Sequence, residues 1–362
     1  MKKLLIVSWS AGAGHVRAAE AIEKAAAVKY PNLEAQHIDL ADYISLPMKK
    51  AIIDSYDIIV KRVPELWGFL YGKINSRKGA DRLTKLTKQL KQANSLKFRK
   101  FVSAYKPDAI ICTHFLATDI LLSAKKRWSI SQPISTLITD YDIHNLWFVP
   151  GTKYYFVATE KMKQKMIQQR ITSAKNIVVS GIPVDPIFYK TKSTALLKKK
   201  HKIPTNKRVV LVLSGGQGLA KSSKIVKTLL KINLPMTIVA IAGNNKRLEN
   251  ALKKINPPKH IKFFPVGWTD KIDEYMRMAD TIISKPGGIT TSECIALKKP
   301  MIIIDPIPGQ EDHNADHLLT YGLGVIARSP EDLEYFVKTP FSYPKQKTSV
   351  PATDIILKTL LK

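Results

Sequence analysis

Apolar and polar positions divide the chain into two kinds of alternating segment. Short runs rich in Ile and Val are separated by longer stretches with helical spacing, such as "VRAAEAIEKAAAVKY" at 16–30. Continuous apolar strands separated by helices are typical of parallel sheets that are covered on both faces. We therefore expect strands at 3–8, 108–114, 134–140, 154–159, 176–181, 208–216, 236–244, 261–268, 280–288 and 300–306.

This rhythm is interrupted at 184–206, where β character is weak and charged residues are frequent. Such a stretch is a good position for a linker, and a length of 362 residues also favours two domains. The expected fold class is α/β, with two doubly wound Rossmann-like domains facing a central cleft. We expect domains at 1–183 and 207–345, a linker at 184–206 and an amphipathic helix in 346–362.

Charge and cysteine content restrict the function. Lys and Arg number 58 against 29 Asp and Glu, a net charge of +29. This balance favours a polyanionic partner, either nucleic acid, an anionic membrane or phosphate ligands, and the alternative is an adaptation for solubility. Cys112 and Cys294 are the only cysteines. Their separation argues against a disulfide framework or a zinc site and fits a reducing, cytoplasmic compartment.

The N-terminus "MKKLLIVSWSAGAGH" begins like a signal peptide. Its apolar run is too short, and Gly and His follow at once, so we expect a first β-strand instead. The chain holds no apolar run near the ~18 residues of a membrane span. Any membrane contact is therefore expected to be peripheral.

Glycine-rich turns follow two of the expected strands in the second half. "LSGGQGLAKSS" at 213–223 and "SKPGGITTSE" at 284–293 each lead from a strand into a helix. Backbone N–H groups at such helix starts attract phosphate, although tight packing alone also explains the glycines. Neither turn has the Gly-Lys-Ser/Thr ending of a P-loop. In the second turn Gly287 and Gly288 allow close approach, and Lys285 would add positive charge.

Polar side chains follow this second turn. Glu293 is either an acceptor for ribose hydroxyls or a capping-box carboxylate. After the next strand, "PIPGQEDHN" places Gly309, Gln310 and Glu311 where they would face the group that a diphosphate carries. A Pro-Gly turn with acids at a helix start is otherwise ordinary.

The order of these turns, together with "SAGAGHVRAAEAI", "TDYDIHNLWFVPGTKYYFVATEKM", "VVSGIPVDPIF" and "AGNNKRLENAL", resembles the motifs of a known family. This is the monogalactosyldiacylglycerol synthase and processive diacylglycerol glucosyltransferase family, part of glycosyltransferase family 28. The resemblance runs from residue 4 to about 326. It implies a GT-B fold and glycolipid biosynthesis by inverting transfer from UDP-glucose or UDP-galactose to diacylglycerol. It also implies that no metal or other cofactor is needed, and that the C-terminal helix returns to the first domain.

The resemblance also assigns roles to residues of the donor site. It places Gly215, Gly216 and Gly218 at the diphosphate, Asn244 and Gly267 at the base, Thr290 and Thr291 at phosphate, Glu293 at the ribose, and Gln310 and Glu311 at the sugar. We add Gly14, Lys285, Gly287, Gly288 and Gly309 to this donor set. The chain departs from the family at Ala11 and Ala13, where one glycine is replaced, and at Asn244, where the family often has Lys. These departures concern substrate detail rather than class.

His15 and Asp140 are the candidates for handling the proton of the acceptor hydroxyl. His15 lies at a helix start, whose positive end disfavours the imidazolium form and suits a base. The alternative is a helix-start residue with solvent contacts. Asp140 follows the strand "ISTLI" and is either the general base or the carboxylate that orients it. The sequence leaves the choice between the two open.

His114, His144 and Trp147 are expected to line the acceptor site. His114 ends a strand, where a purely structural histidine is equally expected, and His144 is expected at the acceptor head group. Asp140 and Asp142 have the Asp-x-Asp spacing of metal-dependent glycosyltransferases. We expect no metal, because the remaining motifs favour the other fold and nothing nearby completes a metal shell.

Residues 49–106 hold fifteen Lys or Arg against four Asp or Glu, interspersed with aromatic residues. Apolar anchors ringed by cations are typical of an interfacial membrane element. An amphipathic helix packed into the domain is the structural alternative, and single-stranded nucleic acid is another. We expect docking to anionic lipids of the inner membrane face, and no nucleic acid, through Lys49, Lys50, Ile52, Tyr56, Ile59, Lys61, Arg62, Trp67 and Phe69.

Two other classes of function remain as alternatives. A UDP-N-acetylglucosamine 2-epimerase-like enzyme would share the fold and the nucleotide but would need no lipid. A non-catalytic basic protein would bind membranes or nucleic acid in a salt-dependent way.

Overall fold

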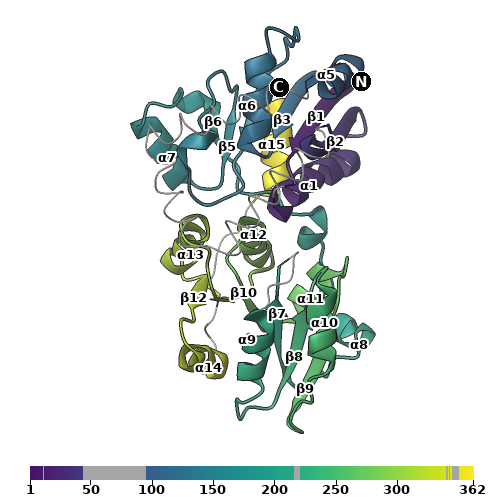
Figure 1. Cartoon of the computed structure of the whole chain (residues 1–362), viewed down its shortest axis with the longest axis vertical. Coiled ribbons are helices and arrows are strands. Elements are labelled where there is room, and N and C mark those ends of the chain that lie inside the picture. Colours follow the sequence, from purple (N-terminus) through teal and green to yellow (C-terminus); the bar gives the residue numbers. More distant parts are fainter. Residues whose placement is uncertain (11, 44–94, 216–220, 340, 342, 345–349) are drawn as a thin grey trace. The chain divides into compact units, whose positions relative to one another are not determined.

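The structure is a computed structural model that describes residues 1–10, 12–43, 95–215, 221–339, 341, 343–344 and 350–362. The chain divides into two compact units, both of α/β architecture (Figure 1). Unit 1 comprises Met1–Pro186, Ile307–His313 and Ser349–Lys362, and unit 2 comprises Ile187–Pro306 and Asn314–Thr348.

Among the described residues, unit 1 contains a six-stranded sheet in the order β2-β1-β3-β4-β5-β6. All neighbouring strands are parallel. The strands are β1 (Lys2–Ser8), β2 (Leu33–Asp39), β3 (Ala109–Cys112), β4 (Ile134–Leu137), β5 (Tyr155–Val157) and β6 (Ile177–Val179).

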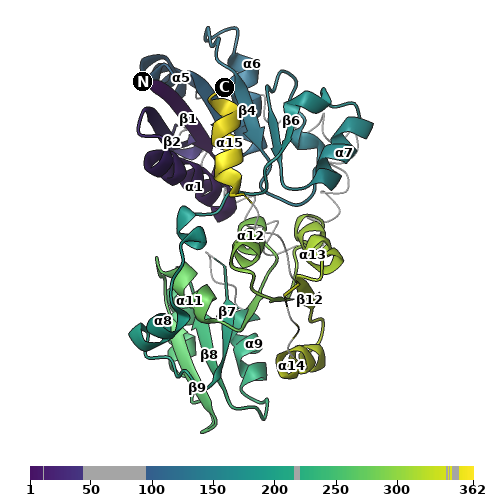
Figure 2. The same ribbon diagram turned by 180° about the vertical axis from the view of Figure 1, so that it is seen from behind.

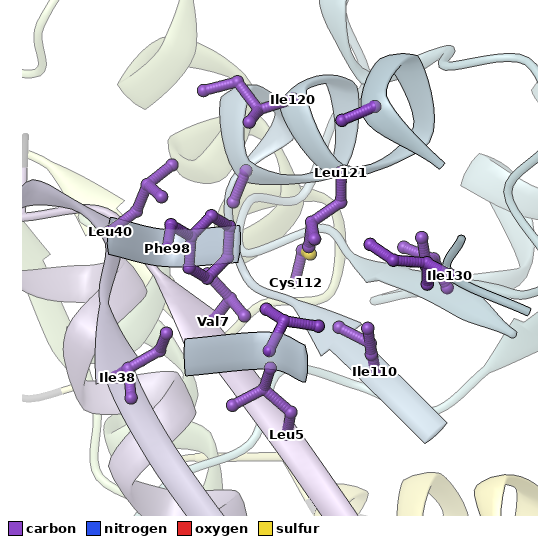
Figure 3. Close-up of a cluster of buried hydrophobic side chains, with 14 of the residues drawn as sticks. Leu5, Val7, Ile38, Leu40, Phe98, Ile110, Cys112, Ile120, Leu121 and Ile130 are labelled. Carbon is purple, nitrogen blue, oxygen red and sulfur yellow. The ribbon is translucent and has the colours of Figure 1, made fainter. Parts of the chain in front are cut away.

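Alternation along β1 sends its side chains to two different cores. Leu5 and Val7 point to the face covered by α5 (Ser95–Tyr105) and α6 (Phe115–Ala124) (Figure 3). Phe98 of α5 fills this core with only 1% of its surface exposed. The opposite face is covered by α1 (Ala13–Lys29), whose buried positions are mostly alanines, so the helix packs close to the strands.

The C-terminal helix α15 (Ala352–Leu360) lies beside α1 in unit 1. Figures 1 and 2 both show α15 in yellow. Ile356 and Leu357 are completely buried, and Asp354 pairs with Lys29 at 2.6 Å. The helix is thus part of the layer that covers the sheet. The other described helical elements of unit 1 are α7 (Glu160–Gln168) and the short 3-10 helices η1 (Leu40–Tyr43), η2 (Asn145–Trp147) and η3 (Ala174–Asn176).

Unit 2 repeats this architecture with a parallel sheet that has six described strands, in the order β12-β11-β10-β7-β8-β9. The strands are β7 (Arg208–Leu213), β8 (Met236–Ile241), β9 (Ile261–Val266), β10 (Thr281–Ser284), β11 (Met301–Ile303) and β12 (Gly324–Ile326). Its helices are α8 (Thr194–Lys200), α9 (Lys221–Leu229), α10 (Lys246–Lys253), α11 (Ile272–Met278), α12 (Gly288–Leu297), α13 (Gln310–Thr320), part of which falls in unit 1, and α14 (Pro330–Lys338).

The stretch 184–206 is ordered rather than a bare linker. It contains the 3-10 helix η4 (Pro186–Tyr189) and α8, and α8 packs on α11. The buried Asp273 of α11 pairs with Lys192 at 2.6 Å, and Glu274 pairs with Lys200 and His201 at 2.8 and 2.6 Å. Three of its basic residues are thus paired with α11, and its residues from Ile187 onward belong to unit 2.

Every apolar run that we expected as a strand contains one, and the α/β fold class is confirmed. Two described strands, β2 and β12, were not expected. Both lie at an outer edge of their sheet.

Candidate active site

The described strands of each sheet have one topological switch point, where the chain leaves two neighbouring strands in opposite directions. In unit 1 this point lies between β1 and β3, and in unit 2 between β7 and β10. Ligands of open parallel sheets bind beyond the C-terminal ends of the strands at such points. The candidate residues that follow these four strands are therefore gathered at one place in each unit.

His15 lies in the first turn of α1, which follows β1, and it contacts the segments after β3 and β4. Its Nδ1 atom is 2.8 Å from the carbonyl oxygen of Thr113 and 2.9 Å from Oγ1 of Thr139. Thr113 comes directly after β3, and its own hydroxyl donates to the carbonyl oxygen of His15 at 2.9 Å. The imidazole is thus fixed from two neighbouring strand ends.

The surroundings of His15 keep the ring neutral. Burial lowers its pKa from the ordinary value of 6.5, while the charge of Asp140 and the hydrogen bond to Thr113 act in the opposite direction. Asp140 is 6% exposed and comes three residues after β4. The structure therefore brings the two candidates for proton handling into electrostatic contact. A neutral His15 follows here chiefly from burial, whereas the sequence argument relied on the helix end.

His114 has a defined structural task. It is the N-cap of α6, where its Nδ1 accepts the backbone N–H of Leu116 at 3.1 Å. The ring lies edge-on to His15, with 4.6 Å between centroids, and it is 7% exposed. Burial holds its pKa well below the ordinary value. His114 therefore shapes the wall of the site, in agreement with the structural alternative that the sequence left open.

His144 and Trp147 lie next to this wall. Phe115 contacts both rings, with centroid distances of 5.4 and 5.6 Å. Burial lowers the pKa of His144 to about 3, so this ring is neutral. Trp147 is 1% exposed, and its indole Nε1 has no hydrogen-bond partner among the described residues. Buried N–H groups are nearly always paired, which makes this donor a candidate for a hydrogen bond to a ligand.

Asp142, the second acid of the Asp-x-Asp spacing, forms an ion pair with Lys165 of α7 at 2.7 Å. In the part of the chain that the structure describes, no group of three or more His, Cys, Asp or Glu side chains is arranged to hold a metal ion.

In unit 2 the start of α12, at the end of β10, has the features of an anion-binding helix terminus. The N-cap is Gly287, no described side chain caps the helix, and the first turn contains no acid. The first N–H groups of a helix have no acceptor within the helix, and its N-terminus carries partial positive charge. A Cβ at Gly287 would meet no described atom within 4 Å, so the space beside this N-cap residue is open.

Two buried hydroxyls at this switch point have no hydrogen-bond partner among the described residues. They are Oγ of Ser214, directly after β7, and Oγ1 of Thr291 in α12. Ser214 is 2% exposed and Thr291 is fully buried. Unpaired hydroxyls beside a helix N-terminus fit a ligand with several oxygen acceptors, such as a diphosphate. Thr290 is half-buried, and Lys285 follows β10 directly.

The helix boundary resolves the two alternatives for Glu293. A capping-box acid stands three residues after the N-cap, a place that Thr290 occupies here because the N-cap is Gly287. Glu293 lies almost two turns into α12 and is 2% exposed. The capping-box alternative is therefore wrong, and the buried carboxylate needs another explanation.

Two further glycines of the donor set have clear structural reasons. Gly215 has a φ of +72°, which favours glycine after β7. At Gly267, after β9, a Cβ would lie 2.6 Å from Oε2 of Glu249, a carboxylate that Lys246 and Lys253 hold in place. Asn244 is exposed and precedes Asn245, which caps α10.

The Gly-Gln-Glu turn is held by its own acids. The Glu311 carboxylate accepts the backbone N–H of Ile307 at 2.7 Å, and Asp312 accepts that of Gly309 at 2.9 Å. Gly309 has a φ of +87°. Glu311 thus orders the turn in this structure, in addition to any contact with a sugar. Gly14 lies inside the first turn of α1, and Gly288 is the first residue of α12.

Several candidates lie outside the described residues. They are Gly216, Gly218, the side chain of Gln310, and all the expected membrane contacts, namely Lys49, Lys50, Ile52, Tyr56, Ile59, Lys61, Arg62, Trp67 and Phe69. Sequence reasoning in turn missed Thr113, Thr139 and Ser214. Their one signal in the sequence is a hydroxyl placed directly after an apolar run.

Two family models match the chain. The model for monogalactosyldiacylglycerol (MGDG) synthase matches residues 15–184, and the model for glycosyl transferases group 1 matches residues 193–338. A relative is the processive diacylglycerol beta-glucosyltransferase of Bacillus pumilus, which is 27% identical over 335 residues. The alignment covers 92% of this chain and 85% of the relative.

Solved structures show the same fold at low sequence identity. UDP-GlcNAc 2-epimerase from Neisseria meningitidis, bound to UDP-GlcNAc, is 15% identical with a TM-score of 0.61, and 99% of each chain is covered. MurG of Acinetobacter baumannii is 14% identical with a TM-score of 0.56, covering 94% of this chain and 90% of that one. The fold is GT-B. Residues 15–184 match the monogalactosyldiacylglycerol synthase family, and over most of its length the chain is related to processive diacylglycerol beta-glucosyltransferases.

Proposed function

We propose that this chain is an inverting glycosyltransferase that moves a hexose from a UDP-sugar to diacylglycerol and forms a β-glycosyl lipid. One observation carries the proposal. The two switch points hold complementary chemistry, a neutral histidine beside Asp140 in unit 1 and an uncapped helix start with unpaired hydroxyls in unit 2. The names of the relatives supply the lipid acceptor and favour glucose over galactose.

In the proposed reaction the hydroxyl of diacylglycerol attacks the anomeric carbon of the sugar as UDP leaves. His15, assisted by Asp140, takes the proton of that hydroxyl. Negative charge that develops on the leaving diphosphate is stabilised by the N–H groups at the start of α12, by Thr290 and Thr291, and by Lys285. These groups supply the positive environment themselves, so we propose that the reaction needs no metal.

We further propose that the protein docks peripherally on the inner face of the membrane. Among the described residues, no helix is long and apolar enough to cross a bilayer. The basic stretch 49–106 ends in α5, which buries Phe98 and exposes Lys97, Arg99 and Lys100. Leu96 on the same helix is 69% exposed and would serve as an apolar anchor. Both cysteines are free and buried, as in a reducing compartment.

Incubation of the purified protein with vesicles that contain diacylglycerol and either UDP-glucose or UDP-galactose tests the function. We expect a β-glucosyl lipid, identified by mass spectrometry and by the anomeric coupling in NMR, and the same rate in excess EDTA. A galactosyl lipid would correct the sugar. Conversion of UDP-N-acetylglucosamine to its 2-epimer, without any transfer to lipid, would replace the proposal with the epimerase alternative.

Vesicle sedimentation tests the docking surface. Replacing Lys97, Arg99 and Lys100 by Gln should weaken binding to anionic vesicles by about 1 kcal/mol for each charge. Replacing Lys49, Lys50, Lys61 and Arg62 should act in the same way and leave UDP binding unchanged. The control replaces Lys198 and Lys199 of α8 in unit 2 by Gln, and its effect is compared for each charge removed. An equal effect of the control would mean that vesicle binding depends on the net charge of the protein and not on a particular surface.

A further inference from the structure

A reciprocal pair of hydrogen bonds joins the first turn of α1 to the end of β3. The ring Nδ1 of His15 is 2.8 Å from the carbonyl oxygen of Thr113, and the Thr113 hydroxyl donates to the carbonyl oxygen of His15 at 2.9 Å. The side chain of each residue is thus hydrogen-bonded to the backbone of the other. The ring has little freedom to rotate away from this position.

The nature of these partners fixes where the ring proton lies. A carbonyl oxygen only accepts, so the Nδ1 atom of His15 must carry the hydrogen that bonds to Thr113. The Thr139 hydroxyl oxygen, at 2.9 Å from the same nitrogen, is a second acceptor for that hydrogen. In a neutral imidazole the other nitrogen then keeps its lone pair. Nε2 of His15 is therefore the proton-accepting atom.

The neighbouring His114 has the opposite tautomer. Its Nδ1 accepts the N–H of Leu116 at 3.1 Å, so its hydrogen is on Nε2, which is a donor. The two rings are 4.6 Å apart, centroid to centroid. Of these two imidazoles, only that of His15 has a lone pair on Nε2.

We propose that Thr113 and Thr139 are positioning residues that hold His15 in the Nδ1–H tautomer and leave Nε2 as the base that deprotonates the acceptor hydroxyl. This inference rests on the proposed function. The hydroxyl proton moves to Nε2 as its oxygen bonds to the anomeric carbon and the bond from that carbon to the UDP oxygen breaks. The ring is then a cation, and the hydrogen bonds from Nδ1 to the two threonine oxygens strengthen because the donor is charged.

Thr139→Val is the principal test, since Val has the shape of Thr but lacks the hydroxyl. Thr139→Ser restores the hydroxyl and serves as the rescue. Thr152→Val is the matched control, because Thr152 is also buried in unit 1 and its hydroxyl bonds to the Val149 carbonyl at 2.7 Å, apart from His15. Circular dichroism confirms that each variant is folded.

Nitrogen-15 NMR of the imidazole reports the tautomer without requiring activity. In the unmodified chain we expect His15 to carry its hydrogen on Nδ1, and Thr139→Val to add a population with the hydrogen on Nε2. In the transfer assay, Thr139→Val should lower kcat by roughly three- to tenfold, the value of one hydrogen bond, with an unchanged KM for the UDP-sugar. The acid limb of its pH profile should move to lower pH, because the ring cation loses an acceptor.

A hydrogen on Nε2 of His15 in the unmodified chain would overturn the inference. So would a Thr139→Val variant whose tautomer and pH profile match those of Thr152→Val. If the protein transfers no sugar at all, the proposed function fails, while the NMR spectra still decide where the hydrogen of His15 lies.

Discussion

The two switch points have the same position in their sheets but are built from different chemical groups. At the β1–β3 point of unit 1 the site consists of imidazole and indole side chains that are mostly buried, and burial lowers the pKa of all three histidines. At the β7–β10 point of unit 2 it consists of a glycine N-cap, helix N–H groups and hydroxyls. One point thus disfavours added charge, and the other attracts negative charge.

This difference matches the division of labour in glycosyl transfer. A general base has to be neutral before it accepts a proton, and burial among aromatic rings keeps His15 in that form. A diphosphate is multiply charged and needs N–H groups and positive potential, which the start of α12 provides. In the proposed reaction the same fold would hold a base in one unit and an anion site in the other, because different side chains follow equivalent strands.

Replacing His15 by Gln should have the largest effect of the variants that test this difference between the two units. Loss of the base is expected to lower kcat by about 10²–10⁴-fold, while calorimetry should show unchanged UDP affinity, because UDP is assigned to unit 2. His37→Gln is the control, since His37 contacts Ser8 at 2.8 Å elsewhere in unit 1. A comparable loss of UDP affinity in His15→Gln would show that the nucleotide depends on unit 1.

The pH dependence of kcat/KM tests whether burial keeps His15 neutral. Burial lowers the pKa of His15 in the folded protein below 6.5, so the ring stays unprotonated, and therefore active as a base, to a lower pH than a free histidine. We expect the acid limb of kcat/KM to have its midpoint below pH 6.5. A midpoint above pH 7 would mean that the charge of Asp140 outweighs burial.

Glu293→Ala tests the anion-binding unit. If the buried carboxylate holds the ribose hydroxyls, its loss should weaken UDP binding by about 10–100-fold, in the range of charged hydrogen bonds. Binding of vesicles should not change. Glu331→Ala, at an exposed position of α14, is the control. Unchanged UDP affinity in Glu293→Ala would remove this residue from the donor site.

Strand positions followed from the sequence where strands are buried on both faces. β2 was not predicted because the polar residues Glu34, Gln36 and His37 interrupt its apolar run. Polar residues are tolerated there because β2 lies at the outer edge of the sheet. β12 is only three residues long and begins with Gly324. The stretch 184–206 was expected as a linker because its β character is weak and its charges are frequent, whereas Asp273 and Glu274, far along the chain, form ion pairs with Lys192 and Lys200 of this stretch.

Candidate residues were predictable where their signal is local. His15 and the glycine turns stand directly after apolar runs, and strand ends face the site in any parallel sheet. Thr113 and Thr139 gain their roles only because β3 is the neighbour of both β1 and β4, an order that the sequence does not state. The capping-box alternative for Glu293 required the helix boundary, which sequence patterns place only within a few residues.

Thr291→Val is expected to have the smallest effect. It is informative because stability should stay the same or rise while UDP affinity should fall. The Thr291 hydroxyl is fully buried without a hydrogen-bond partner among the described residues. An unpaired buried hydroxyl costs about 1–3 kcal/mol, so an isosteric apolar side chain should leave the free energy of unfolding of ligand-free protein unchanged or raise it. If the same hydroxyl binds the diphosphate, UDP affinity should fall by roughly three- to tenfold.

Thr237→Val is the matched control, because its hydroxyl on β8 of unit 2 is also buried and has no partner in the described part of the chain. Both variants should have the same effect on the free energy of unfolding, measured by denaturant titration. UDP affinity, measured by calorimetry, should fall in Thr291→Val alone. Equal UDP affinities in the two variants would mean that the hydroxyl at α12 is an ordinary packing defect. The anion site of unit 2 would then consist of backbone N–H groups, and its contrast with unit 1 would be one of backbone against side chain.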